Sequence, residues 1–143
     1  MYLYYKIPGK AISKKNSLRM VLNRKTFKIM PIQSKAWKKY EKHAKQYLKP
    51  LRDPIDFPVN VKVTYWIHKN KDGSMPKTKL DQLNLLAGTD DLLVKYKILK
   101  DDDCRIVVAH DGSRVYYTSI GEEYTEIEIQ SFNITEEISD RNH

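Results

Sequence analysis

The chain has 143 residues, of which 41% are hydrophobic and 31% charged, and a formal net charge of +8. This length is typical of one domain with a buried core, and no apolar run approaches the roughly 20 residues of a membrane-spanning helix. Cys104 is the only cysteine, which excludes an intrachain disulfide and suits a reducing compartment. The apolar start, Met1 to Pro8, lacks a cleavage site of small residues and predicts a strand rather than a signal peptide.

The two halves of the chain carry opposite charge. Residues 1–79 contain 20 lysines and arginines against 4 acids, whereas residues 80–143 contain 6 against 14. A basic surface attracts phosphate groups through counterion release, and an acidic cluster beside it can hold a divalent cation. The distribution favours a nucleic-acid-binding protein over a merely solvated surface, although lysine-rich domains with other functions are common.

The first 30 residues predict a strand and a hairpin. The strand covers Tyr2–Ile7 and is broken by Pro8-Gly9. A polar loop follows over residues 10–19. Residues 20–30 then predict a short hairpin that turns around Asn23-Arg24-Lys25.

The segment from Gln33-Ser34 predicts a helix that runs to about Lys49, where Pro50 ends it. At helical spacing one face is apolar, and lysines occupy much of the rest. The apolar face comprises Trp37, Tyr40, Ala44, Tyr47 and Leu48. Beyond this helix, Val59–Ile67 alternates apolar and polar residues and predicts a strand.

A second helix is predicted near the middle of the chain, with Thr78 as its N-cap in the motif Thr78-x-x-Asp81. It is expected to tolerate Gly88 at some cost and to place Asp90 and Asp91 on its surface. The residues expected to face the core are Leu83, Leu86, Ala87 and Val94.

Three strands are predicted after this helix. Residues 106–109 are apolar and predict a buried strand, and Asp111-Gly112 predicts a hairpin turn into Val115-Tyr116-Tyr117. Residues 125–130 alternate and predict a half-exposed strand. The element order predicts a single α+β domain over residues 1–132, with a mixed or antiparallel sheet and helices mainly on one face. Residues 133–143 form a polar tail.

Few residues other than the carboxylates suggest chemistry. The four histidines are scattered without metal-ligand spacing, so they do not predict a zinc site and are expected to be structural or exposed. Cys104 could be a nucleophile, but no sequence motif indicates a histidine that would activate it. It lies beside a predicted buried strand and is expected to pack there.

Carboxylates remain as candidates for the site. Asp81 lies near a helix start, and the run Asp101, Asp102, Asp103 follows about 20 residues later, just before a strand. A helix and a turn back could bring these points together, and converging aspartates bind Mg²⁺, which assists attack on a phosphodiester. From spacing alone the structural alternative is better supported: Asp81 caps its helix and the run is a solvated loop.

The chain resembles the RusA family of Holliday junction resolvases over about residues 2–130. The most specific stretches are Lys79-Leu80-Asp81-Gln82-Leu83, then Asp91-Leu92-Leu93, then Asp101 to Val107. The family pattern is Asp-x-Asp-Asn-Leu, then Asp-Ala-Leu, then Asp-Asp-x-x-Val/Ile. In this alignment Asp81 matches the second aspartate of the first motif.

The resemblance implies a homodimer, encoded by a phage or prophage and acting in the bacterial cytoplasm, that cuts four-way DNA junctions symmetrically. Three aspartates would hold Mg²⁺, with Mn²⁺ as an alternative. By position Asp81 matches the second ligand and either Asp102 or Asp103 the third, because the extra aspartate leaves the register open by one residue. Asp101 and Lys79 are further site candidates.

The sequence departs from the family pattern at the first motif. Lys79 stands where the family has its first aspartate, and Gln82 where it has asparagine. A cation in place of a ligand weakens Mg²⁺ binding electrostatically. The helix is also about two residues longer before the aspartate run than the pattern requires.

Three functions are therefore compatible with the sequence. They are a metal-dependent junction endonuclease, a catalytically inactive junction-binding or accessory protein of the same fold, and a protein-interaction module that does not bind DNA. The expected DNA contacts are Lys14, Lys15, Arg19, Arg24, Lys25, Lys35, Lys38 and Lys39.

Overall fold

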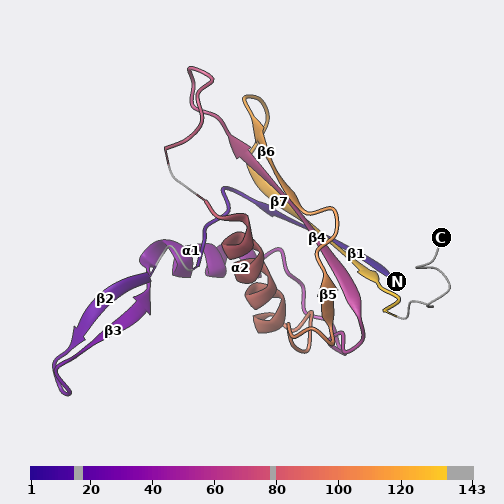
Figure 1. The fold of residues 1–143 in the computed structure, drawn as a ribbon, viewed down its shortest axis with the longest axis horizontal. Coiled ribbons are helices and arrows are strands. Elements are labelled where there is room, and N and C mark those ends of the chain that lie inside the picture. Colours follow the sequence, from indigo (N-terminus) through magenta and orange to yellow (C-terminus); the bar gives the residue numbers. More distant parts are fainter. Residues whose placement is uncertain (15–17, 78–79, 135–143) are drawn as a thin grey trace, which may run out of the picture.

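The fold is organised around a long central strand, β4 (Val59–His68), in a five-stranded sheet. The computed structural model describes residues 1–14, 18–77 and 80–134. Strand β7 (Tyr124–Ser131) pairs antiparallel with β4 on one side and with β1 (Tyr2–Pro8) on the other. On the far edge, β5 (Val107–Ala109) and β6 (Arg114–Thr118) both run parallel to β4. The sheet is mixed, as predicted (Figure 1).

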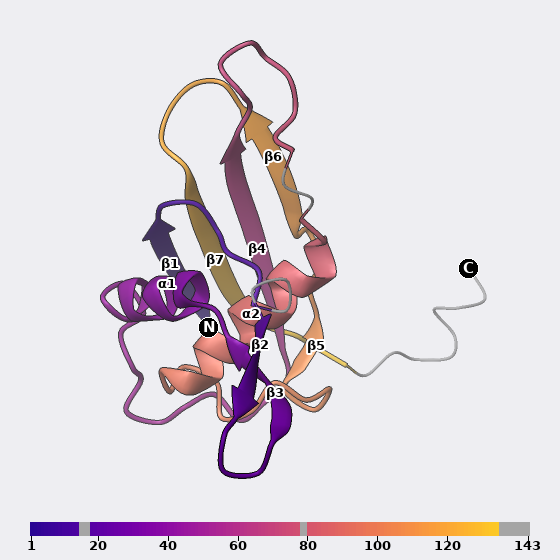
Figure 2. The same cartoon turned by 90° about the vertical axis from the view of Figure 1, so that its left-hand side faces the viewer.

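Both helices, α1 (Lys35–Lys45) and α2 (Gln82–Lys95), cover the same face of this sheet (Figure 2). The core lies between the sheet and the two helices, because every second residue of β4 points toward the helices. The buried residues of β4 on this side are Val59, Val61, Val63, Tyr65 and Ile67. The α+β fold and the order of its elements are therefore confirmed.

The predicted hairpin at Asp111-Gly112 is wrong, because β5 and β6 do not pair with each other. They follow one another in the same direction along β4, and residues 110–113 interrupt this edge. The Asn60 side chain bonds both the backbone N–H of Asp111 (2.7 Å) and its carbonyl (3.1 Å). Gly112 has a φ of +84° and lies against the Lys62 side chain. Asp111 and Gly112 therefore form a turn that interrupts the edge of the sheet between β5 and β6.

Helix α1 begins as predicted, with Ser34 Oγ accepting from the Trp37 N–H at 3.2 Å. It ends earlier than expected. The N–H of Tyr47 bonds the carbonyl of Ala44 at 2.9 Å, an i to i+3 bond that tightens the last turn. Tyr47, expected on the buried face, is 39% exposed, whereas Leu48 is buried.

Helix α2 begins at Gln82 with Asp81 as its N-cap, not with Thr78, which lies outside the described residues. The expected core face is partly wrong. Leu83 is 74% exposed and Ala87 is exposed, because the buried face is turned by one to two residues from the predicted one. Its buried leucines are Leu85, Leu86, Leu92 and Leu93.

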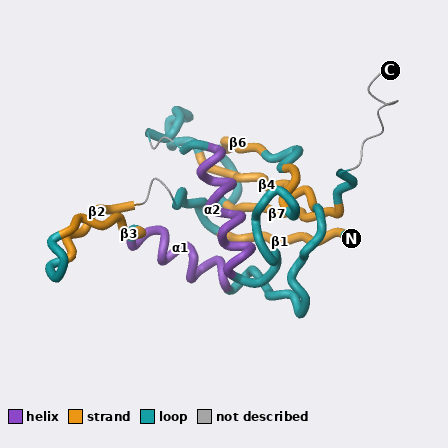
Figure 3. The backbone as a smooth tube through the Cα atoms, turned by 60° about the horizontal axis from the view of Figure 1, so that its bottom comes forward, coloured by secondary structure: helices purple, strands orange, loops and turns teal. Residues whose placement is uncertain are grey.

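The predicted hairpin of residues 20–30 is confirmed as a separate two-stranded sheet, β2 (Leu18–Asn23) and β3 (Lys28–Gln33). It projects from the body of the molecule beside α1 (Figure 3). Cys104 is exposed, so its expected packing role is wrong. No helix in the described ranges is long and apolar enough to cross a membrane.

Candidate functional site

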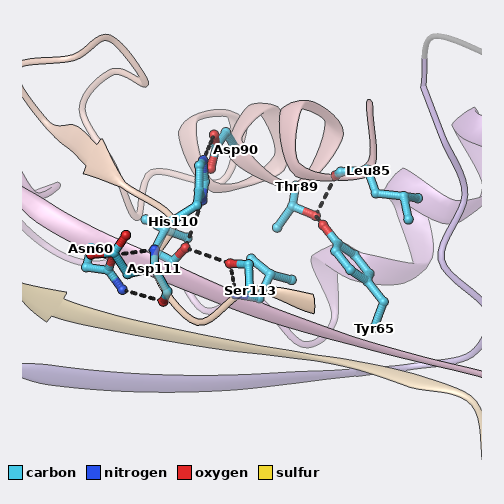
Figure 4. Close-up of polar contacts among 10 residues, drawn as sticks. Asn60, Tyr65, Leu85, Thr89, Asp90, His110, Asp111 and Ser113 are labelled. Atoms are coloured by element: carbon cyan, nitrogen blue, oxygen red, sulfur yellow. Dashed lines mark hydrogen bonds and ion pairs between the residues drawn. The ribbon is translucent and has the colours of Figure 1, made fainter. Parts of the chain in front are cut away.

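A buried carboxylate and a histidine link α2 to the broken edge of the sheet (Figure 4). Asp90, on α2, is 8% exposed, and its Oδ2 lies 2.9 Å from Nε2 of His110. The other ring nitrogen of His110, Nδ1, lies 2.8 Å from the Val61 carbonyl of β4. The imidazole therefore bridges the helix and the central strand at the point where β5 ends.

The two members of this pair both bind protons more tightly than usual. Burial raises the pKa of Asp90, while the bond to His110 opposes that shift. The hydrogen bond from Asp90 raises the pKa of His110, against the opposing effect of burial. The other Asp90 oxygen, Oδ1, is buried and has no hydrogen-bond partner among the residues that the structure describes. The site therefore favours a protonated pair.

A second buried contact lies one residue back along α2. Thr89 Oγ1 donates to the Leu85 carbonyl at 3.0 Å within the helix. Tyr65 Oη lies 2.6 Å from Thr89 Oγ1, and it donates because the threonine proton is already used. Together with the histidine bridge, this contact fixes the middle of α2 against β4 (Figure 4).

The N-terminal end of α2 is attached to the start of β6. Gln82 Nε2 donates to the Ser113 carbonyl at 3.2 Å. Asp81 is exposed, and its Oδ1 accepts from the Leu83 N–H at 2.9 Å. Asp81 thus caps α2, and its role as a metal ligand stays a prediction.

The aspartate run follows the C-terminal end of α2 and contains three different environments. Asp103 is bound by Arg105, with Oδ2 accepting from Nη2 at 2.7 Å and Oδ1 from Nε at 3.0 Å. These bonds lower the pKa of Asp103 to about 2. Asp101 Oδ1 accepts from the Asp102 N–H at 2.7 Å. Asp102 makes no ion pair within the described ranges, and burial followed by repulsion from Asp91 raises its pKa.

Comparison with known proteins identifies the family. The family model of endodeoxyribonuclease RusA matches residues 3–130, which is most of the chain. The chain belongs to the RusA endodeoxyribonuclease family. No curated protein matches it by sequence. The resemblance drawn from the aspartate motifs is thereby confirmed.

The three aspartates that the RusA resemblance implies as metal ligands do not fit one magnesium site as they lie. Mg²⁺ ligands lie about 2.0–2.1 Å from the ion, whereas α2, with 14 residues, separates Asp81 from the run by a helix about 21 Å long. Within residues 1–14, 18–77 and 80–134, no group of three or more His, Cys, Asp or Glu side chains could hold a metal ion.

The chain path explains why Asp81 and the run do not converge. After α2 the chain turns toward residue 55, where the Lys100 N–H bonds the Ile55 carbonyl at 2.9 Å. It then enters β5 beside Val59, at the beginning of β4. The chain therefore turns back along α2, and residues 101–103 lie beside its C-terminal half, where burial and then the charges of Asp91 and Asp90 raise the pKa of Asp102. Asp81 lies at the N-terminal end of α2, near β6.

The basic residues proposed to contact DNA fall into three groups. Lys14 is paired with Asp91 at 3.1 Å, so its charge is partly offset. Arg19 lies on β2, and Lys15 lies outside the described residues, as does the further site candidate Lys79. The remaining cations are exposed on α1 or at the β2–β3 turn. They are Arg24, Lys25, Lys35, Lys38 and Lys39.

Sequence reasoning missed the Asp90–His110 pair and wrongly placed Asp90 on the surface. The two residues are 20 positions apart, and no motif spacing marks them. They meet because β5 pairs parallel with β4 and ends beside α2. The sequence predicts a hairpin there instead of a parallel edge. The available signal was a charged residue within a largely apolar helix face.

Proposed function

We propose that this protein is a structure-selective endonuclease that resolves four-way DNA junctions. The family match over residues 3–130 carries this proposal, and the excess of cations in residues 1–79 supports it. We further propose that it acts as a homodimer in the bacterial cytoplasm and requires a divalent cation, Mg²⁺ or Mn²⁺. The metal requirement rests on family membership, since the aspartates as arranged do not form one metal site.

Among the aspartates of the run, Asp102 is the better candidate for the reaction, with Asp81 at the other end of α2. The carboxylate of Asp103 is engaged on both oxygens by Arg105. Within the described residues Asp102 has no such ion pair, and burial followed by repulsion from Asp91 raises its pKa. A carboxylate outside an ion pair is available to a substrate or a metal.

The helix start supports a second alignment of the family motif, moved by two residues. In it, Asp81 matches the first aspartate, Leu83 the second, and Asn84 the asparagine of Asp-x-Asp-Asn-Leu. This alignment removes the two extra residues before the aspartate run. It also explains why an exposed position in the first turn of α2 carries a leucine: the residue occupies a place where the family has an acid.

A cleavage assay on a synthetic four-way junction tests the proposal. With Mg²⁺ or Mn²⁺, the wild-type protein is expected to cut the junction, and Asp81→Asn and Asp102→Asn are expected to bind it without cutting. Asp53→Asn, at an exposed loop position, is the matched control and should cut normally. Normal cutting by both site variants would remove Asp81 and Asp102 from the reaction.

A catalytically inactive junction-binding protein is the second candidate. Lys79, Gln82 and the wide separation of the aspartates favour it. It predicts salt-sensitive junction binding with no nicking in either metal. Two single substitutions then separate the alignments: gain of cleavage by Lys79→Asp supports the first, and gain by Leu83→Asp supports the second.

A further inference from the structure

The β2–β3 hairpin extends away from the body of the molecule, and within residues 1–14, 18–77 and 80–134 it pairs with no other strand (Figures 1 and 3). A two-stranded hairpin is only marginally stable by itself in water. Near its end, Leu22 and Ile29 are paired across the two strands, so they share one face, and they are 53% and 66% exposed. Exposed apolar residues on a projecting arm indicate that the arm meets a partner.

The charge of the hairpin indicates which partner. Residues 18–33 contain four cations and no acid. Three of them, Arg24, Lys25 and Lys28, are exposed around the turn. Such a tip repels the same tip of a second copy and attracts a polyanion.

Phe27 is the unusual residue of this turn. It is 81% exposed, and its φ of +56° lies in the left-handed region, which disfavours a bulky side chain. The turn is well bonded: the Phe27 N–H donates to the Asn23 carbonyl at 2.7 Å, and Asn23 Oδ1 accepts from the Lys25 N–H at 3.0 Å. The backbone thus holds a large apolar ring in solvent at a position where asparagine or glycine would be less strained.

We propose that Phe27 is a wedge that stacks against a base at the branch point of the DNA while the surrounding cations bind phosphates. This inference rests on the proposed binding of junctions. Aromatic side chains stack on bases of any sequence, and apolar wedges enter DNA most easily where bases are already unstacked. A branch point offers such bases and a continuous duplex does not, so Phe27 confers preference for branched DNA.

The test is equilibrium binding of a four-way junction and of a linear duplex of the same sequence, in EDTA. Phe27→Ser is expected to weaken junction binding by about 10-fold or more, the contribution of one stacked base, and to change duplex binding by less than about 2-fold. Phe27→Trp should retain junction preference. Ile120→Ser, which removes another exposed apolar residue (80%), is the matched control and should bind as wild type does.

A 2-aminopurine base at the branch point reports stacking directly. Its fluorescence should change on binding of the wild-type protein but not of Phe27→Ser. Equal losses on junction and duplex, or no loss, would overturn the wedge while leaving the proposed function intact. If light scattering showed a dimer for the wild type and a monomer for Phe27→Ser, the wedge would be overturned, and the partner of the hairpin would be a second copy of the chain. Absence of any wild-type junction binding at ~50 mM salt would overturn the proposed function and the wedge together.

Discussion

Asp90 and His110 hold one proton between them. His110 Nδ1 lies 2.8 Å from the Val61 carbonyl, an acceptor only, so this nitrogen carries a hydrogen. Nε2 faces Asp90 Oδ2 at 2.9 Å. If Nε2 and the carboxylate were both deprotonated, two lone pairs would face each other. A proton therefore lies in this contact, either on the imidazolium or on the carboxylic acid.

The shared proton predicts a pH dependence of stability. The pKa of His110 is raised above 6.5 by the bond to Asp90, and that of Asp90 is raised above 3.8 by burial. A group whose folded pKa is raised stabilises fully below its unfolded pKa and loses this contribution as pH rises through the folded pKa. The free energy of unfolding is thus expected to fall as pH rises, through Asp90 from above about pH 3.8 and through His110 from above about pH 6.5. Urea denaturation at a series of pH values measures this fall.

Asp90→Asn should reverse this slope. The neutral amide of asparagine removes the carboxylate that raises the pKa of His110, whereas the burial that lowers this pKa remains. The pKa of His110 would therefore fall, and stability would be lost below about pH 6.5. His110→Ala leaves Asp90 buried without a partner and should cost about 1–3 kcal/mol. The same slope in wild type and Asp90→Asn would contradict the shared proton.

The two acids at the end of the aspartate run should differ in cleavage. Asp102→Asn is expected to reduce the rate by roughly 100-fold or more, because removing a group that stabilises charge in the transition state costs several kcal/mol. Asp103→Asn releases Arg105 and should leave most of the cleavage intact. Junction nicking under single-turnover conditions measures both. Equal losses of cleavage in the two variants would show that Asp103 breaks its ion pair with Arg105 and takes part in the reaction.

Local periodicity explains which elements the sequence could predict. The alternation over Val59–Ile67 and the helical spacing of Trp37, Tyr40 and Ala44 reflect burial on one face, which is a local property of each segment. The parallel pairing of β6 with β4 depends on residues about 50 positions apart. A turn signal such as Asp111-Gly112 reports the backbone angle and does not specify which strand lies alongside.

The candidate site was predictable to a smaller degree. The aspartate motifs led to the family, because their order along the chain is a sequence property. Their spatial arrangement was not accessible, since it depends on how the chain leaves α2 near Ile55. Burial of Asp90 was missed for a related reason: a charged residue is tolerated inside only with a partner, and His110 comes from the distant edge strand.

The α1 lysines should contribute to DNA binding through charge. Replacing Lys35, Lys38 and Lys39 by glutamine is expected to make the salt dependence of junction affinity shallower, by about 0.9 for each phosphate that the variant no longer neutralises. Lys97→Gln, at an exposed position beyond α2, serves as the control. Fluorescence anisotropy at several salt concentrations measures the slope, and an unchanged slope in the triple variant would exclude this face of α1 from the interface.

Gly88 of α2 lies directly against the ring of Trp37 from α1. A Cβ at position 88 would lie 3.2 Å from Trp37 Cη2 and 3.3 Å from its Cζ3. The indole is 1% exposed and packs on Tyr40 with ring centroids 5.9 Å apart, so it has little room to move. The helix-weakening glycine is thus explained by packing.

This contact predicts that Gly88→Val destabilises the protein by about 1–3 kcal/mol, the usual cost of an overpacked core. The gain in helix propensity over glycine, about 0.5 kcal/mol, offsets only part of it. Ala87→Val, one residue earlier on the exposed face of the same helix, should cost about 0.5 kcal/mol. Urea denaturation followed by tryptophan fluorescence compares the two. Equal stability of both variants would mean that the Trp37 ring can shift and that the two helices are not fixed at this contact.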